Sequence, residues 1–305
     1  MKEKKQRTGG QIICDAMISE GTNAIFGMPG GASLPFYDAL YHYPQITHYS
    51  MRHEQGAGYA ADGYARALNR VGIATATSGP GATNLVTSMA SALMDSVPVL
   101  FITGQVATEF IGTDAFQETD STGVSIPVTK QNYLVKNVEE LPHIVAEAFY
   151  LARSGRPGPV HLDVPKDIFL ATTDIETPSE VRVPGYRPAE MGDKGMIHRA
   201  AKAISEAEKP LIIAGHGIAI SEAFKELKEL AEKTNTPVIT TLHGVGNFPE
   251  THELSLGMLG MHGMYYANLA VHHSDLLVAL GMRFDDRVTG RVKDFAPNAN
   301  IVHID

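Results

Sequence analysis

The chain has 305 residues, of which 44% are hydrophobic and 19% charged, a balance that excludes an intrinsically disordered protein. The net charge of −9 makes nucleic acid or an anionic membrane surface a poor partner. A single cysteine, Cys14, excludes an internal disulfide framework, and we interpret it as a small buried apolar residue. No secretory signal and no apolar run of membrane-spanning length is present, so we expect a cytoplasmic protein.

The first half of the chain alternates between strand-like and helical patterns. The expected helices are residues 10–20, 34–41, 54–68, 82–95 and 141–155, and the expected strands lie within 24–31, 46–51, 71–81, 98–105 and 157–167. Strand–helix alternation of this kind predicts an α/β fold in which a parallel sheet is covered by helices on both faces.

A proline-containing stretch without periodicity separates this half from a second alternating series. We therefore expect a first domain over residues 1–172, a linker over 173–195 and a second domain over 196–305. The second series predicts helices at 196–208 and 221–235 and strands within 210–217, 237–241 and 275–281. Ser221 is the expected N-cap of the helix 221–235, whose apolar face would carry Phe224, Leu227, Leu230 and Ala231.

Two glycine-containing turns follow predicted strands. SGPGATNL (78–85) opens a helix, so its backbone N–H groups could hold a phosphate, although the glycines could equally serve a tight, closely packed turn. GHGIAI (215–220) lacks the third glycine of a dinucleotide fingerprint, which weakens a plain NAD-dependent oxidoreductase as an interpretation. The 13 histidines show no metal-ligand spacing, and no GxSxG nucleophile motif is present.

Glu54 stands at the start of a predicted helix that is poor in bulky side chains. Gly56, Ala60, Gly63 and Ala67 recur three to four residues apart and form a small-residue stripe on one helix face. One interpretation is a close-packed helix with an acid stabilised by the helix dipole. The other is an acid that sits against a flat ligand.

Seven segments carry a resemblance to a known family. They are IFGMPGGASLPFYDAL (25–40), RHEQGAGYAADGYAR (52–66), ATSGPGATN (76–84), GTDAFQETD (112–120), RPGPVHLDVPKD (156–167), LGMLGMHG (256–263) and GMRFDDRVTG (281–290). Together they resemble the large catalytic subunit of acetolactate synthase, a thiamine-diphosphate-dependent enzyme. The resemblance implies a pyrimidine-binding domain followed by a Rossmann-like, FAD-binding central domain that is incomplete here.

The resemblance implies a role for Glu54. In the family a glutamate hydrogen-bonds N1′ of the aminopyrimidine ring, which promotes removal of the cofactor's C2 proton, and Glu54 matches that position. Such a transferase decarboxylates pyruvate and joins the two-carbon unit to pyruvate or 2-ketobutyrate, in the biosynthesis of valine, leucine and isoleucine.

The same resemblance assigns further contacts. Thiamine diphosphate would lie beside Glu54, Gly31, Ala32, Gly79 and Asn84. Phe116, Gln117 and Lys166 would line the substrate channel, although a core aromatic at 116 and a surface lysine at 166 are alternatives. FAD would contact Arg156, Gly215, Gly217, His262, Gly263, Gly281, Arg283, Asp285, Arg287 and Asp305. For Arg283 and Asp285 the alternative is an ordinary ion pair at a strand end.

The family holds the diphosphate and Mg²⁺ through a third domain, and no segment here matches it. We therefore expect no metal ligands in this chain, and we expect residues 1–305 to be inactive alone and to belong to a longer polypeptide. The implied partners are a second copy of the chain, in a homodimer or a dimer of dimers, and a small regulatory subunit. The alternatives are another thiamine-diphosphate decarboxylase or carboligase, or a non-catalytic nucleotide-binding module.

Overall fold

The structure is a computed structural model that describes residues 6–305. The chain divides into two compact units, Met1–Glu190 and Met191–Asp305. The boundary falls within the stretch predicted as a linker, and each unit has its own parallel sheet. Among residues 6–305, no helix is both long enough and apolar enough to cross a membrane.

A six-stranded sheet forms the centre of the first unit, with all neighbouring strands parallel and in the order β3-β2-β4-β5-β7-β6. The strands are β2 (Ala24–Gly27), β3 (Thr47–Ser50), β4 (Gly72–Ala76), β5 (Val99–Gln105), β6 (Gln131–Leu134) and β7 (Val160–Pro165). The chain order reverses between β2 and β4, because β3 lies on one side of β2 and all later strands lie on the other. Ligands of such sheets bind beyond the carboxyl ends of the strands at this reversal.

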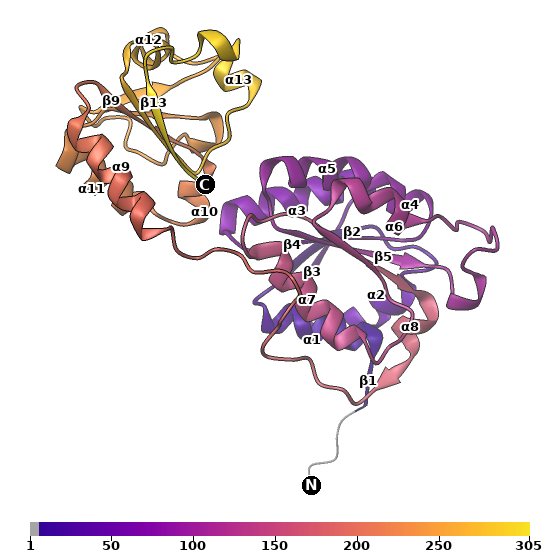
Figure 1. The fold of residues 1–305 in the computed structure, drawn as a ribbon. Coiled ribbons are helices and arrows are strands. Elements are labelled where there is room, and N and C mark those ends of the chain that lie inside the picture. Colours follow the sequence, from indigo (N-terminus) through magenta and orange to yellow (C-terminus); the bar gives the residue numbers. More distant parts are fainter. Residues whose placement is uncertain (1–5) are drawn as a thin grey trace. The chain divides into compact units, whose positions relative to one another are not determined.

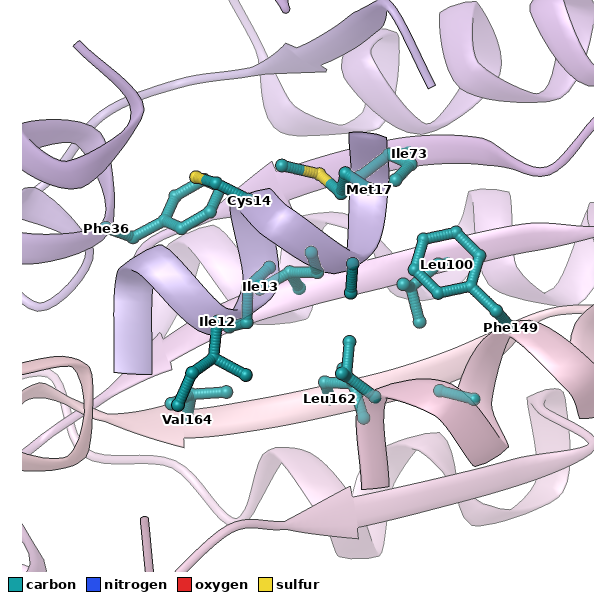
Figure 2. Close-up of a cluster of buried hydrophobic side chains, with 14 of the residues drawn as sticks. Ile12, Ile13, Cys14, Met17, Phe36, Ile73, Leu100, Phe149, Leu162 and Val164 are labelled. Atoms are coloured by element: carbon teal, nitrogen blue, oxygen red, sulfur yellow. The ribbon is translucent and has the colours of Figure 1, made fainter. Parts of the chain in front are cut away.

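Helices cover both faces of this sheet (Figure 1). One face carries α1 (Gly9–Ser19), α2 (Leu34–Leu40), α7 (Leu141–Arg153) and α8 (Lys166–Leu170), and the other carries α3 (Glu54–Leu68) and α5 (Val86–Asp95). The strands alternate accordingly: Leu100 and Ile102 join the core under α1, whereas Val99 and Phe101 join the core under α3. Figure 2 shows the first core, with side chains of α1 packed onto the sheet and Cys14 among them. The interpretation of Cys14 as a buried apolar residue is confirmed.

Local sequence signals set several helix ends. Thr8 and Gln11 form a reciprocal capping box at the start of α1. Gly155 follows the C-cap of α7 with φ +56°, as expected for a residue just past a helix end. The helix predicted over residues 82–95 is instead two helices, α4 (Pro80–Asn84) and α5, because the Leu85 N–H donates to Ala82 O and tightens the turn. An antiparallel pair of β1 (Arg7–Thr8) with β8 (Thr172–Thr173) was not predicted.

A five-stranded parallel sheet forms the second unit, in the order β11-β10-β9-β12-β13. The strands are β9 (Pro210–Ala214), β10 (Val238–Thr240), β11 (Ser255–Met258), β12 (Leu276–Leu280) and β13 (Asn300–Ile304), and the helices are α9 (Lys194–Glu206), α10 (His216–Ile220), α11 (Phe224–Thr234), α12 (Tyr265–His273) and α13 (Asp286–Thr289). In chain order the strands stand 3-2-1-4-5, the Rossmann arrangement, with the reversal between β9 and β12. Both units therefore have the predicted α/β architecture with parallel sheets.

The predicted cap at Ser221 is wrong. A short helix, α10, occupies residues 216–220, and the Ser221 hydroxyl donates back to Gly217 O at 2.7 Å instead of capping α11. Helix α11 begins at Phe224, which is 43% exposed, while Leu227 and Ala231 form its buried face.

Candidate functional site

The loops that follow β2, β3, β4 and β5 lie at the carboxyl edge of the first sheet. Most of the predicted thiamine-diphosphate and substrate residues lie in these loops or at the helix starts directly after them. The edge includes the reversal between β2 and β4, which is where parallel sheets bind ligands.

Glu54 is the first residue of α3, and its side chain is buried at 8% exposure. The His53 imidazole accepts the Gln55 N–H at 3.2 Å, which caps the helix and fixes the direction in which Glu54 enters it. The Asn84 amide of α4 donates to Glu54 Oε2 at 2.9 Å. Within residues 6–305 no donor is bonded to the second oxygen, Oε1. The result is a buried carboxyl group with one oxygen fixed and one available.

Contacts with the Thr77 side chain join the β2 and β4 loops. The Ala32 N–H donates to the Thr77 hydroxyl at 3.2 Å, and a Cβ on Gly30 would meet the Thr77 side chain. A Cβ on Gly31, by contrast, would have no atom within 4 Å. Gly31 therefore borders open space at the edge where Glu54 begins α3.

Gly79 has a packing role. Its φ is +58°, and a Cβ there would stand 2.5 Å from Gln117 O. Only glycine combines that backbone with so close a neighbour. This supports the close-packing interpretation of the SGPG turn, and it brings the loop after β5 against the start of α4.

The loop after β5, residues 106–119, carries two of the three predicted channel residues. Phe116 is 88% exposed, so the alternative of a core aromatic is wrong. Gln117 is exposed and has φ +58°. Lys166 is exposed at the start of α8, and next to it Asp167 accepts hydrogen bonds from Thr108 N and Oγ1 at 3.0 and 2.5 Å. The three predicted residues thus project from elements at one sheet edge.

A buried polar chain beneath this loop was not predicted. Asp163 and His161 of β7 are 0% and 1% exposed, and Thr103 Oγ1 lies 2.6 Å from Asp163 Oδ1 and 2.8 Å from His161 Nε2. Ser125 Oγ lies 2.9 Å from His161 Nδ1, and Gln105 Nε2 donates to Asp163 Oδ2 at 2.9 Å. Thr103 donates to the carboxyl group, so it accepts from Nε2–H, and the neutral imidazole accepts the Ser125 hydroxyl at Nδ1.

Burial shifts the pKa values of Asp163 and His161, the two titratable groups of this buried hydrogen-bonded chain, in opposite directions. It raises the pKa of Asp163 to about 7, although the bonds from Thr103 and Gln105 oppose the rise. It lowers the pKa of His161 to about 3. The sequence signal was visible: two polar residues occupy alternate positions of an otherwise apolar strand.

In the second unit, three predicted FAD residues meet at the reversal of the sheet. Gly215 and Gly217 follow β9 and Gly281 follows β12; Gly217 N–H donates to Gly281 O at 2.8 Å. A Cβ on Gly217 would stand 2.5 Å from Gly281 Cα, and one on Gly215 would overlap Gly281 O. The buried Asn247 amide donates to Gly215 O at 2.7 Å. The two turns therefore pack main chain against main chain at the reversal of the sheet, the position at which such sheets bind nucleotides.

The other predicted residues of this unit lie after β11, β12 and β13, in loops and in the short helix α13. Asp285 accepts from Arg287 N and Val288 N at 2.9 and 3.2 Å and so caps α13. Its carboxylate also lies 3.6 Å from Arg283, the ion pair that was named as the alternative. His262 and Gly263 follow β11, in a loop that meets the Arg287 backbone through a 2.9 Å bond from Met261 N. Asp305 follows β13 and is exposed.

Arg156 lies apart from Glu54 within the first unit. It precedes β7 and donates to the Ser96 hydroxyl at 2.7 Å, and both residues are at the amino edge of the sheet. A cavity of about 500 Å³ also lies away from Glu54, between α1 and residues 174–179. It is lined by Arg7, which pairs with Asp15 at 3.2 Å, and by further polar side chains.

Two family models match the chain. The N-terminal TPP binding domain of thiamine pyrophosphate enzymes matches residues 7–124, and the central domain of the same enzymes matches residues 197–305. The two matches cover most of both parallel-sheet units, and the chain therefore belongs to the thiamine pyrophosphate enzyme family.

Three curated relatives indicate which enzymes of this family the chain resembles. The chain is 53% identical over 300 residues to a probable acetolactate synthase large subunit of Methanocaldococcus jannaschii, covering 97% of this chain and 51% of the relative. It is 51% identical over 301 residues to the acetolactate synthase large subunit of Corynebacterium glutamicum, with coverage of 99% and 48%. It is 52% identical over 317 residues to an acetolactate synthase of Arthrospira platensis, with coverage of 100% and 55%. The chain spans about half the length of these relatives.

Proposed function

We propose that this chain is the pyrimidine-binding and central part of an acetolactate synthase large subunit. The reaction is decarboxylation of pyruvate and transfer of the two-carbon unit to pyruvate or 2-ketobutyrate, in branched-chain amino acid biosynthesis. One observation carries the proposal: Glu54 is a buried carboxyl group at the sheet reversal, with Oε2 held by Asn84 and Oε1 available.

Thiamine diphosphate would occupy the edge bordered by Glu54, Gly31 and Ala32, with Gly79 and Asn84 behind them. When bound, it supplies the acidic carbon and the electron sink for cleaving a 2-keto acid. Glu54 Oε1 would hold a proton at a ring nitrogen of the aminopyrimidine, and Asn84 would keep the carboxyl group turned toward that atom. Glu54 is 8% exposed, so most of the residue is shielded from solvent while Oε1 stays free to meet the ring.

FAD would occupy the reversal of the second sheet. The position of Gly215, Gly217 and Gly281 supports this, because they follow β9 and β12 at the reversal where Rossmann-type sheets bind nucleotides. His262, Gly263, Arg283, Asp285, Arg287 and Asp305 would border it. Among residues 6–305 no group of three or more metal-binding side chains occurs, and Mg²⁺ would be held by a separate pyrophosphate-binding domain.

The chain's partners follow from the same proposal. Phe116, Gln117 and the Lys166 cation would line the approach of the anionic keto acids. A second copy of the chain would form a homodimer or a dimer of dimers in the cytoplasm, and a small regulatory subunit would bind to it.

The test is Glu54→Gln in the protein expressed from its complete reading frame. Loss of the carboxylate should lower the rate of acetolactate formation from pyruvate by about 10²–10⁴-fold. Glu147→Gln is the matched control, because Glu147 lies on α7 and a glutamine oxygen can still accept from Tyr133, which donates at 3.1 Å. Activity of E54Q equal to that of E147Q would refute the proposal, and a product other than a 2-aceto-2-hydroxy acid would assign another thiamine-diphosphate reaction.

A further inference from the structure

Gln105 is placed to hold both ends of one loop. It is the last residue of β5 and is 3% exposed. Its Oε1 accepts the Val106 N–H at 2.9 Å, where the loop begins, and its Nε2 donates to Thr119 O at 2.9 Å, where the loop ends. One side-chain amide therefore closes the base of residues 106–119.

Asp163 fixes the orientation of that amide. The second Nε2 proton of Gln105 goes to Asp163 Oδ2 at 2.9 Å, and the other carboxyl oxygen accepts from Thr103. A flipped amide would turn its oxygen toward both Asp163 and Thr119 O, so only one orientation satisfies all three contacts.

The rest of the loop is organised to follow its base. The Glu118 carboxylate accepts N–H bonds from Gly112, from Thr113 at 3.2 Å and from Ala115 at 3.0 Å, which tie the tip together. Those N–H groups hold the pKa of Glu118 below its usual range. The tip carries Gln117, whose carbonyl lies against Gly79.

We propose that Gln105, oriented by Asp163, is a positioning residue that clamps residues 106–119 and so sets where Gln117 meets Gly79. Its importance for catalysis rests on the proposed function, because that function makes Phe116 and Gln117 substrate residues. The clamp itself is testable without cofactor or substrate.

The main variant is Gln105→Glu, which replaces the Nε2 donor by an oxygen facing Asp163 and Thr119 O. Gln131→Glu is the matched control, because Gln131 Oε1 accepts the next N–H, that of Asn132, at 3.1 Å but lies on the surface with no carboxyl partner. Asp163→Asn should preserve the clamp: the new side-chain amide can accept from Gln105 and donate to Thr103. The Thr103 proton then turns to His161 Nε2, and the imidazole takes its other tautomer, with Nδ1–H donating to Ser125. Asp163→Leu has a similar shape and offers no acceptor, so it should release the clamp.

Two readouts follow the loop. Chymotrypsin cuts after Phe110 and Phe116, quantified by mass spectrometry against cuts after Tyr265, should be about tenfold faster in Q105E and D163L than in the parent, Q131E and D163N. The chain has no tryptophan, so Phe116→Trp adds a single tryptophan to the loop. Its fluorescence anisotropy should be lower when Gln105→Glu is also present, because the loop is then freed. If Q105E does not fold, Gln105→Ala removes the same contacts without adding a charge and should behave alike.

The proposal is overturned if loop cleavage in Q105E or Q105A stays within about twofold of the parent. It is also overturned if D163L and D163N are cleaved equally, because the orientation of Gln105 by Asp163 then has no effect. Neither result bears on E54Q, so failure of the clamp and failure of the proposed activity are distinguishable.

Discussion

Gly79 and Gly31 lie in two neighbouring loops at the same sheet edge, but they are glycine for different reasons. Gly79 needs its positive φ and its closeness to Gln117 O for the fold itself. Gly31 meets nothing, so a side chain there costs the folded chain little. A glycine that the fold does not require is the better candidate for contact with a ligand.

This difference predicts opposite results from the same substitution. Gly79→Ala should lower the free energy of unfolding by about 1–3 kcal/mol, because it combines backbone strain with overlap at Gln117. Gly31→Ala should change it by less than about 0.5 kcal/mol. Urea unfolding of both variants checks this, and an equal loss in the two would contradict the assignment. Under the proposed function, G31A should still weaken thiamine-diphosphate binding.

At the scale of elements, α3 has two faces built from small residues. Ala57, Gly58, Ala61 and Ala65 are buried, and Gly58 lies so close to Ser88 of α5 that a Cβ would overlap the hydroxyl. The stripe predicted from sequence, Gly56 to Ala67, is the other face. There Gly63 is exposed and would offer an added Cβ no contact within 4 Å.

Alanine at the two glycines should therefore act in opposite directions. Gly63→Ala should raise the free energy of unfolding by about 0.5–1 kcal/mol, because alanine is the better helix former. Gly58→Ala should lower it, since α3 and α5 cannot keep their spacing. Thermal unfolding, with sedimentation to record the oligomeric state, distinguishes them. A destabilised G63A would contradict an open face and would indicate that another chain covers it.

At the scale of the whole molecule, the buried pair His161 and Asp163 shapes the response to pH. Asp163 binds its proton more tightly folded than unfolded, so its contribution to stability falls as pH rises from about 4 to about 7. His161 resists protonation when folded, so its contribution rises with pH from about 3 to about 6.5. The two slopes oppose each other between about pH 4 and pH 6.5.

Single substitutions should separate the two slopes. The stability of the parent minus that of Asp163→Asn should fall with rising pH across this window, by on the order of 1 kcal/mol per pH unit. The stability of the parent minus that of His161→Gln should rise at a similar rate. Urea titrations at several pH values give both differences. Two flat difference curves would mean that neither group has a perturbed pKa.

The alternation of strands and helices was readable in the sequence because apolar periodicity is local. The helix 54–68 was predicted with the bounds it has, and the parallel sheets followed from the order of elements. Two predictions failed where a short helix precedes a longer one: residues 82–95 were predicted as one helix, and Ser221 was predicted as a helix cap. Residue preferences at helix ends do not reveal that a separate short helix comes first. Neither the strand order nor the β1–β8 pair could be predicted, because both depend on contacts distant in sequence.

The site divides in the same way. Glu54 and the glycine turns stand out by residue type and position, and family resemblance selected them. Asn84 as the partner of Glu54, and Gln117 as the neighbour of Gly79, are separated from them by 30 and 38 positions, so only the folded sheet edge joins them. The Gln105–Asp163 clamp escaped prediction because a glutamine ending an apolar strand has no distinctive pattern.

The contact of Gly215 and Gly217 with Gly281 has one more consequence. Two turns from different strands touch through bare backbone, with no side chain between them to rotate or yield. One turn cannot move without the other, so we expect the pair to be rigid and not to act as a hinge. Any conformational change on ligand binding in the second unit should therefore occur in its other loops, while the turns after β9 and β12 keep their positions.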